Sequence, residues 1–330
     1  MAILATEKVL TLDYWKPAGK LQVGDWVFDR NGKPVQIKLI QEYRAEECYE
    51  VTFDDWLTVS GDFNLGLPTE NVKYRKRTYE YKGKFKFSRP LTRVTAQKLT
   101  EGPFRNHKNN LIYSVPTTKP LELPHQDLPV PPFIFGFWFF AGRYAKHIAP
   151  GRGKEEEVQQ AFKEHGYKTK LHRLTSHNTR AFSVTPTIES QLIPNIPKQI
   201  PNNYLLGSTE QRIDLLRGIF CTKGRNYSPS KDRFMFSNRH FGTISRIQGV
   251  VESLGIKTKI LRNEKLNFYS LIFRSRYKLV ANQVSPPIRV HQARRYITNV
   301  TSIPGQSCIH IETDGQDNTI LVGEGFISTC

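Results

Sequence analysis

The stretch GYKTKLHR at residues 166–173 returns later in the chain as GIKTKILR at residues 255–262. A sequence that repeats itself in this way predicts two copies of one structural unit. Apolar residues with helical spacing precede the copies, namely Val158, Ala161 and Phe162 in the first and Ile247, Val250, Val251 and Leu254 in the second. Runs rich in aromatic and β-branched residues follow, at residues 180–184 and 267–273. Each repeat therefore predicts a helix that stops at Gly, and then two strands.

An apolar segment of matching design begins each repeat. These segments are FIFGFWFFAG at residues 133–142 and IDLLRGIFCTKG at residues 213–224. In each segment a Gly is followed six residues later by another, and these glycines are Gly136 and Gly142, and Gly218 and Gly224. The early Gly has no Cβ and lets two helices approach closely, whereas the late Gly stands where a helix should stop. The alternative is a pair of buried helices in an unrelated α/β fold.

These paired helices resemble the LAGLIDADG homing endonucleases. The resemblance implies that the two helices pack as a pseudo-twofold interface, and that an acidic residue before each final Gly holds divalent metal over DNA. Here Ala141 and Lys223 take those two places. An alanine has no lone pair to offer Mg²⁺, the metal expected for the family, and a lysine ammonium would repel it. We therefore expect no bound Mg²⁺, and DNA cleavage that is absent or very poor.

DNA binding can outlast cleavage, because Lys and Arg contacts to DNA do not need the metal. The formal net charge of +18 favours a polyanionic partner, although a soluble basic protein is the plain alternative. The resemblance implies that the strands after each helix lie in the major groove. The candidate DNA-binding residues are Lys168, Lys170, Arg173, Arg180, Arg225, Lys231, Arg233, Arg239, Lys257, Lys259, Arg262, Arg274 and Arg276.

A second basic segment, KYRKRTYEYKGKFKFSR at residues 73–89, precedes the first repeat. Basic and aromatic residues alternate along it with the period of a β-strand, which predicts one charged and one packed face. We expect an accessory DNA-binding arm within residues 73–120. The alternative is an ordinary edge strand that its lysines guard against unwanted pairing.

Both ends of the chain predict short strands without helices. The expected strands are residues 8–12, 26–28, 35–40, 48–53 and 56–59 at one end, and 307–312, 318–322 and 325–329 at the other. Turn signals such as DRNG at residues 29–32 separate them. Neither end alone is long enough to bury a complete core. We therefore expect the two ends to form one β domain that the middle of the chain interrupts.

Three stretches of these ends resemble an intein splicing domain, the Hint fold. They are TEKVLTLD at residues 6–13, PAGKLQVGDWV at residues 17–27 and ILVGEGFIST at residues 320–329. The resemblance implies a mixed fold: an all-β Hint splicing domain formed from both chain ends, with an inserted α/β LAGLIDADG domain of two pseudo-symmetric repeats. We expect the Hint domain at residues 1–90 and 290–330, the LAGLIDADG domain at residues 125–285, and the repeats at residues 131–205 and 210–285.

The same resemblance locates the splicing residues. Inteins begin with a Cys or Ser that attacks the preceding carbonyl, and Ala2 stands in that place. The Thr-x-x-His that activates this carbonyl is matched by SGDF at residues 60–63, where Ser60 and Asp62 keep polar groups but Phe63 cannot act as acid or base.

The last residues also depart from the family pattern. The chain stops at Thr329-Cys330 without the Asn that cyclises. Cys330 is either a relic of the downstream nucleophile or an altered penultimate His. Cys308 stands where some inteins carry an assisting Asp or Cys, or else it is a packing residue. The changed positions are explained either by natural decay or by deliberate substitution.

These observations predict an intein with a LAGLIDADG-like DNA-binding domain, blocked in splicing and inactive as a nuclease. Splicing needs no cofactor, and the expected partners are double-stranded DNA at the insertion site and the flanking host segments, the exteins. We expect an intracellular protein, because the cysteines form no disulfide framework. We expect no membrane contact, because the longest apolar stretch is shorter than ~20 residues. We also expect a monomer. The alternatives are a free-standing site-specific DNA-binding protein and an active homing endonuclease with other metal ligands.

Overall fold

The computed structural model describes residues 2–13, 15–71, 76–80, 84–88, 91–141, 147–148, 150, 155–174, 180–192, 199–222, 225–228, 233–280 and 293–330. Only the backbone is described at residues 76–80, 84–88, 173–174, 180 and 225–228. The chain divides into two units. Unit 1 comprises Met1–Glu122, Glu252–Lys257 and Arg289–Cys330, and unit 2 comprises Leu123–Val251 and Thr258–Ile288.

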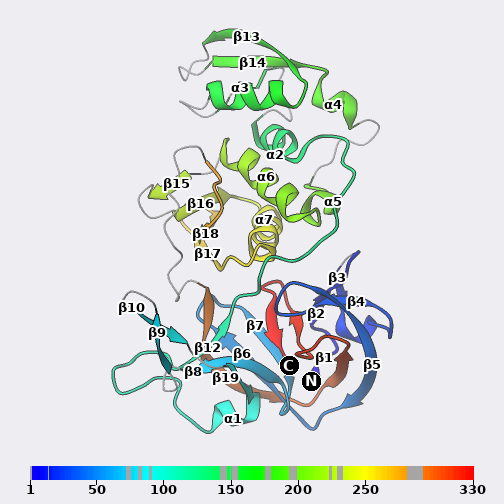
Figure 1. The fold of residues 1–330 in the computed structure, drawn as a ribbon, viewed down its shortest axis with the longest axis vertical. Coiled ribbons are helices and arrows are strands. Elements are labelled where there is room, and N and C mark those ends of the chain that lie inside the picture. Colours follow the sequence, from blue (N-terminus) through cyan, green and yellow to red (C-terminus); the bar gives the residue numbers. More distant parts are fainter. Residues whose placement is uncertain are drawn as a thin grey trace. The chain divides into compact units, whose positions relative to one another are not determined.

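Unit 1 is built mainly from strands (Figure 1). Its strands are β1 (Ala2–Leu4), β2 (Lys8–Leu10), β3 (Trp15–Pro17), β4 (Trp26–Phe28), β5 (Pro34–Arg44), β6 (Glu47–Phe53), β7 (Thr58–Asp62), β8 (Gly66–Asn71), β9 (Lys76–Glu80), β10 (Lys84–Ser88), β11 (Leu91–Thr95), β12 (Tyr113–Pro116), β19 (Arg294–Pro304), β20 (Ser307–Thr313), β21 (Ile320–Val322) and β22 (Ile327–Thr329). Its helices are the 3₁₀ turn η1 (Ala18–Lys20) and α1 (Ala96–Thr100). The strands form sheets in the orders β11-β8-β12-β19-β6-β7-β1-β20-β5-β4, β22-β21-β2-β3 and β10-β9.

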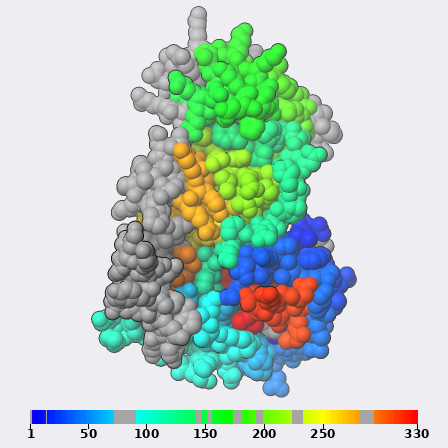
Figure 2. Space-filling model, viewed as in Figure 1, coloured from blue at the N-terminus to red at the C-terminus, as the bar shows by residue number. Residues whose placement is uncertain are grey.

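Strand β1 joins the two ends of the chain within one sheet. On one side it pairs with β20, with Ala2 opposite His310, and on the other it pairs with β7, with Ile3 opposite Gly61. Figure 1 shows the marked chain ends close together in this unit, and Figure 2 shows C-terminal residues, in red, among N-terminal residues in blue. Both ends therefore contribute to one structure.

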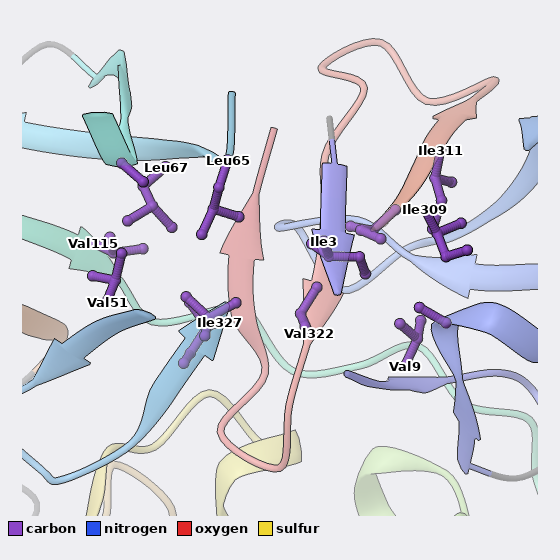
Figure 3. Packing of buried hydrophobic residues seen from close by; sticks show 14 of the residues in the cluster. Ile3, Val9, Val51, Leu65, Leu67, Val115, Ile309, Ile311, Val322 and Ile327 are labelled. Atoms are coloured by element: carbon purple, nitrogen blue, oxygen red, sulfur yellow. The ribbon is translucent and has the colours of Figure 1, made fainter. Parts of the chain in front are cut away.

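The core of unit 1 draws on both ends as well (Figure 3). Ile3 and Val9 from the N-terminal part are packed in one buried cluster with Ile309, Val322 and Ile327 from the C-terminal part. Each of these side chains is at most 2% exposed. Burial of one such side chain contributes roughly 1.5–3 kcal/mol. Neither end could keep this core without the other.

One local prediction in unit 1 is wrong, and one strand was missed. The segment 56–59 was expected to be a strand, but Trp56 has a φ of 69° and is 76% exposed, and β7 begins only at Thr58. The backbone turns there, since the N–H of Trp56 donates to the carbonyl of Phe53 at 3.1 Å. Strand β19 was not predicted, although its eleven residues pair with β6 and β12.

Unit 2 combines helices with two small sheets. Its helices are α2 (Pro132–Ala141), α3 (Glu155–Glu164), α4 (Ile188–Gln191), α5 (Asn202–Leu205), α6 (Thr209–Phe220) and the greater part of α7 (Phe241–Ser253). Its strands are β13 (Lys168–Leu174), β14 (Arg180–Thr185), β15 (Arg225–Ser228), β16 (Arg233–Asn238), β17 (Thr258–Asn263) and β18 (Phe268–Arg274), in the orders β13-β14 and β15-β16-β18-β17. The prediction of a mixed fold with antiparallel sheets is confirmed. Among the described residues, no helix is long and apolar enough to cross a membrane.

Helices α2 and α6 touch through their backbones at two glycines. A Cβ added to Gly136 would lie 2.4 Å from the carbonyl oxygen of Leu215, and one added to Gly218 would lie 2.1 Å from that of Phe133. Carbon and oxygen atoms cannot approach so closely, so only Gly allows this packing. The contact fixes the separation of the two helices.

Replacement of Gly218 by Ala should therefore destabilise the protein by on the order of 2 kcal/mol, because backbone atoms cannot yield and the helices must separate. Gly249 in α7 is the matched control, since an added Cβ there meets nothing within 4 Å. Gly249→Ala should stabilise by up to about 1 kcal/mol, because Ala is the better helix former. Denaturant unfolding of both variants gives the comparison, and equal shifts in the same direction would contradict the account.

Candidate functional site

Ala2, the residue at the expected nucleophile position, lies buried in unit 1 at 1% exposure. It packs in a small cluster with Leu4, Ala45, Cys48 and Cys308. The cluster is apolar apart from its two thiols. Residue 2 is therefore held away from solvent, on a short strand between two longer ones.

Cys48 and Cys308 bring their sulfur atoms within 3.7 Å of each other. Both side chains are fully buried. Burial raises the pKa of the Cys308 thiol well above its ordinary value, and the neighbouring Cys48 and the Asp62 carboxylate raise it further. At neutral pH Cys308 is therefore a neutral thiol in contact with the cluster around residue 2.

Asp62, at the end of β7, is fixed by two hydrogen bonds. The Tyr43 hydroxyl donates to its Oδ2 at 2.6 Å, and the N–H of Asn64 donates to its Oδ1 at 2.9 Å. Burial and the Asp62 carboxylate both raise the pKa of Tyr43. The carboxylate therefore accepts from a hydroxyl that stays protonated over the physiological range.

The neighbours of Asp62 differ in their exposure. Ser60 is buried, and its N–H donates to Oε1 of Glu7 at 2.7 Å. Phe63, at the place expected for the activating His, is 48% exposed. Gly61 meets residue 2 directly, because a Cβ added to it would lie 2.3 Å from the Ala2 carbonyl oxygen.

Cys330 contacts the other end of the same segment, residues 61–66. Its N–H donates to the carbonyl of Gly66 at 2.9 Å. Arg93 donates from Nε to the carbonyl of Cys330 at 3.2 Å and from Nη2 to that of Asn64 at 2.9 Å. Burial raises the pKa of the Cys330 thiol, and Arg93 opposes part of this rise. The preceding Thr329 is buried, and its hydroxyl donates to the carbonyl of Ile320 at 3.3 Å.

The structure thus places Ala2, Ser60, Asp62, Cys308 and Cys330 in one region of unit 1. Four residues of this region were not among the expected site residues, namely Glu7, Tyr43, Cys48 and Arg93. No sequence signal identifies Tyr43 or Arg93, since their contacts depend on strand register over long separations. Cys48 packs against a second thiol, that of Cys308.

The metal positions of the LAGLIDADG resemblance lie in unit 2. Ala141 is the last residue of α2, while Gly142, Lys223 and Gly224 lie outside the described residues. A methyl group and an ammonium group offer no oxygen to a divalent ion. Within the part of the chain that the structure describes, no group of three His, Cys, Asp or Glu side chains could hold a metal ion. The residues at these positions do not fit Mg²⁺.

The four-stranded sheet of unit 2 has one face against helices. Phe220 of α6 packs on Phe234 and Phe273, with ring centroids 5.2 and 5.6 Å apart. Phe140 of α2 packs on Phe236 at 5.2 Å. Because side chains alternate along a strand, the residues between these aromatics point to the opposite face.

That opposite face carries several of the candidate DNA-binding residues. Lys259 and Arg233 are exposed there, and Arg233 stands directly opposite Arg274 in register. The register thus places two guanidinium side chains next to each other on this face. In the first repeat, Lys168 and Lys170 are exposed on β13.

The remaining candidates lie elsewhere. The ammonium of Lys257 is 2.6 Å from the Asp54 carboxylate within unit 1, which makes it poorly available to DNA. Arg262 and Arg276 lie over the rings of Tyr269 and Tyr277 at 5.9 and 5.5 Å. Arg239 is exposed just before α7. Lys231 and the side chains of Arg173, Arg180 and Arg225 lie outside the described part of the chain, as does part of the basic segment 73–89.

No family model matches the chain. Comparison with known proteins gives a relative in sequence and several solved structures. The chain is 25% identical over 307 residues to the replicative DNA helicase DnaB of Mycobacterium intracellulare, an alignment that covers 87% of this chain and 49% of the helicase. The chain thus spans about half the length of this relative.

Two solved structures represent the other matches. The DnaB1 intein splicing domain from Msm, bound with zinc, is 25% identical, with a TM-score of 0.20 over 21% of this chain and 55% of that domain. I-DmoI in complex with DNA and Mn is 13% identical, with a TM-score of 0.32 over 50% of this chain and 96% of that protein. The matches thus include intein splicing domains and LAGLIDADG proteins, the two groups that the sequence resembles.

Glu7, which accepts the Ser60 N–H, should give the protein a measurable pH dependence. Burial raises its pKa above the ordinary value of 4.5, with hydrogen bonds from Ser60 acting against the rise. A carboxyl whose pKa is raised in the folded state binds its proton more tightly there, so stability is lost as pH rises through this window. Glu7→Gln keeps an acceptor for Ser60 without the charge.

The Glu7→Gln variant should therefore gain stability relative to the unchanged protein as pH rises from 4 to 7. Denaturant midpoints across this range measure the effect. Glu324→Gln, at an exposed pair with Lys8, is the control and should leave the profile almost unchanged. Parallel profiles for Glu7→Gln and the unchanged protein would refute the assignment.

Proposed function

We propose that this chain is an intein in which unit 1 is the Hint splicing domain and unit 2 is an inserted LAGLIDADG-type domain that binds DNA. One observation carries the proposal. Residue 2 and residue 330 contact the same short segment of unit 1, Ala2 through Gly61 and Cys330 through Gly66. Splicing transfers an acyl group from one junction to the other, so the two junctions must lie together.

In this proposal splicing is blocked at its first step. The nucleophile of an intein attacks the preceding carbonyl with a thiol or hydroxyl, and the methyl group of Ala2 has neither. The phenyl ring of Phe63 cannot donate or accept a proton. Ser60, Asp62 and Cys308 remain as polar groups near residue 2, and Thr329 and Cys330 mark the downstream side.

Unit 2 acts in this proposal as a DNA-binding domain without nuclease activity. The close glycine contact between α2 and α6 supports a pseudo-twofold pair of helices. The exposed Lys259 and Arg233, together with the half-buried Arg274, support binding to phosphates, which needs no metal. Ala141 and Lys223 supply no carboxylate for hydrolysis.

The splicing assignment is tested by placing the chain in frame between two reporter domains. The unchanged chain should give no cleaved or ligated product. The double variant Ala2→Cys with Phe63→His should be cleaved at the upstream junction by dithiothreitol, because the introduced thiol converts the preceding amide to a thioester. Gel electrophoresis and mass spectrometry identify the products.

The matched control carries Ala5→Cys with Phe63→His, since Ala5 lies just beyond β1 and its thiol is not at the junction. This control should resist dithiothreitol. Resistance of the Ala2→Cys variant as well would show that residue 2 is not the nucleophile position. Ligation by the unchanged chain would show that splicing is not blocked.

The nuclease assignment is tested on DNA duplexes that the chain selects from a random pool. With Mg²⁺ or Mn²⁺ the unchanged chain should make no specific strand breaks, because positions 141 and 223 lack carboxylates. Ala141→Asp combined with Lys223→Asp should gain metal-dependent cleavage of the same duplexes, whereas Ala141→Asn with Lys223→Gln should not. Specific double-strand breaks by the unchanged chain would mean that other residues hold the metal.

A further inference from the structure

The helix-free face of the four-stranded sheet in unit 2 carries an apolar stripe, formed by Met235, Ile272 and Leu261. Met235 on β16 stands directly opposite Ile272 on β18. Ile272 in turn stands opposite Lys259 on β17, and Leu261 lies two residues further along that strand. Diagonal neighbours of this kind are within reach of each other across a sheet. The three apolar side chains therefore lie in neighbouring positions on one face of the sheet.

The apolar stripe is accessible. Leu261 is 44% exposed, and Met235 and Ile272 are each partly exposed. The residues that alternate with them along the strands, such as Phe234 and Phe236, face the helices and are fully buried. A grouped set of exposed apolar side chains marks a surface that meets a partner.

Basic residues lie at one end of the apolar stripe, where Arg233 and Arg274 stand opposite each other, and Lys259 stands opposite Ile272. Leu261 stands directly opposite Ser270, whose hydroxyl is 2.8 Å from that of Ser237. Basic side chains beside an apolar surface fit the major groove of DNA, where phosphates line the rim and base edges form the floor.

Thymine is the one base of ordinary DNA whose major-groove edge presents a methyl group. We propose that Met235, Ile272 and Leu261 select thymine-containing steps of double-stranded DNA by packing against these methyl groups. The inference rests on the DNA binding proposed above for unit 2. It assigns sequence selectivity to apolar contact, and orientation on the duplex to Arg233, Arg274 and Lys259.

The test exchanges one methyl group in the DNA and leaves the protein unchanged. Duplexes are first selected from a random pool with the full chain, and each thymine of the tightest duplex is then replaced singly by deoxyuridine, which lacks only the methyl. Loss of one buried methyl should weaken binding about fourfold at the thymines that contact the stripe. Other thymines of the same duplex should show no change. Fluorescence anisotropy at several salt concentrations gives the dissociation constants.

Variants of the protein then identify the side chains involved. Leu261→Ser and Ile272→Ser should each bind the selected duplex more weakly than the unchanged chain does. Each variant should bind the thymine duplex and its deoxyuridine forms with the same affinity. The matched control is Leu266→Ser, because Leu266 is 63% exposed but lies in the turn between β17 and β18. This control should keep both the affinity and the discrimination. Circular dichroism checks that each variant is folded.

Three outcomes separate this inference from the proposal beneath it. Specific, salt-dependent binding with equal affinity for thymine and deoxyuridine would overturn the inference and leave DNA binding in place. Absence of any selected duplex would overturn DNA binding, and the inference with it. Self-association of the chain that Leu261→Ser abolishes, without DNA binding, would show that the apolar stripe contacts protein instead.

Discussion

Unit 1 depends on one short strand. The three residues of β1 pair with β7 on one side and with β20 on the other, and so join segments at opposite ends of the chain. Closing so long a loop costs conformational entropy, but the cost rises only with the logarithm of loop length. The shared core, in which Ile3 packs with Ile309 and Val322, offsets that cost. A domain built in this way tolerates a large insertion between its halves.

The contacts that shape the proposed sites do not depend on the catalytic side chains that these sites lack. Gly61 and Gly66 meet residues 2 and 330 through backbone atoms, and Gly136 and Gly218 join two helices in the same manner. Such backbone packing survives a change of side chain from Cys to Ala or from Asp to Lys, because the changed side chains take no part in these contacts. In the function that we propose, the scaffold and the chemistry can therefore be lost separately. In the same proposal DNA binding can persist without the catalytic residues, since it needs charge and shape but no metal.

Local features of the fold were predictable from the sequence, whereas most individual contacts between distant residues were not. Strand β4 lies where it was expected, at Trp26–Phe28, because its apolar residues and flanking turns are a local signal. Helix α6 begins at Thr209 rather than near residue 213, and the signal that marks its start is the capping box of Ser208 and Gln211. The contact between Cys48 and Cys308, which are 260 residues apart, depends on register within a ten-stranded sheet. The pair Gly136 and Gly218 was found because the two copies of the internal repeat can be compared with each other.

The pairing of β1 with β20 also sets an order in time. The residues of β20 are synthesised about 300 residues after those of β1, which is roughly 15–60 s at the usual ~5–20 residues per second of translation. Until β20 leaves the ribosome, residue 2 has no neighbour on that side and its buried cluster lacks Cys308. Insertion of unit 2 lengthens this interval. In the function that we propose, the surroundings of the upstream junction would be completed only after the downstream segment had been made, so the sheet itself would delay cutting of a half-made host protein.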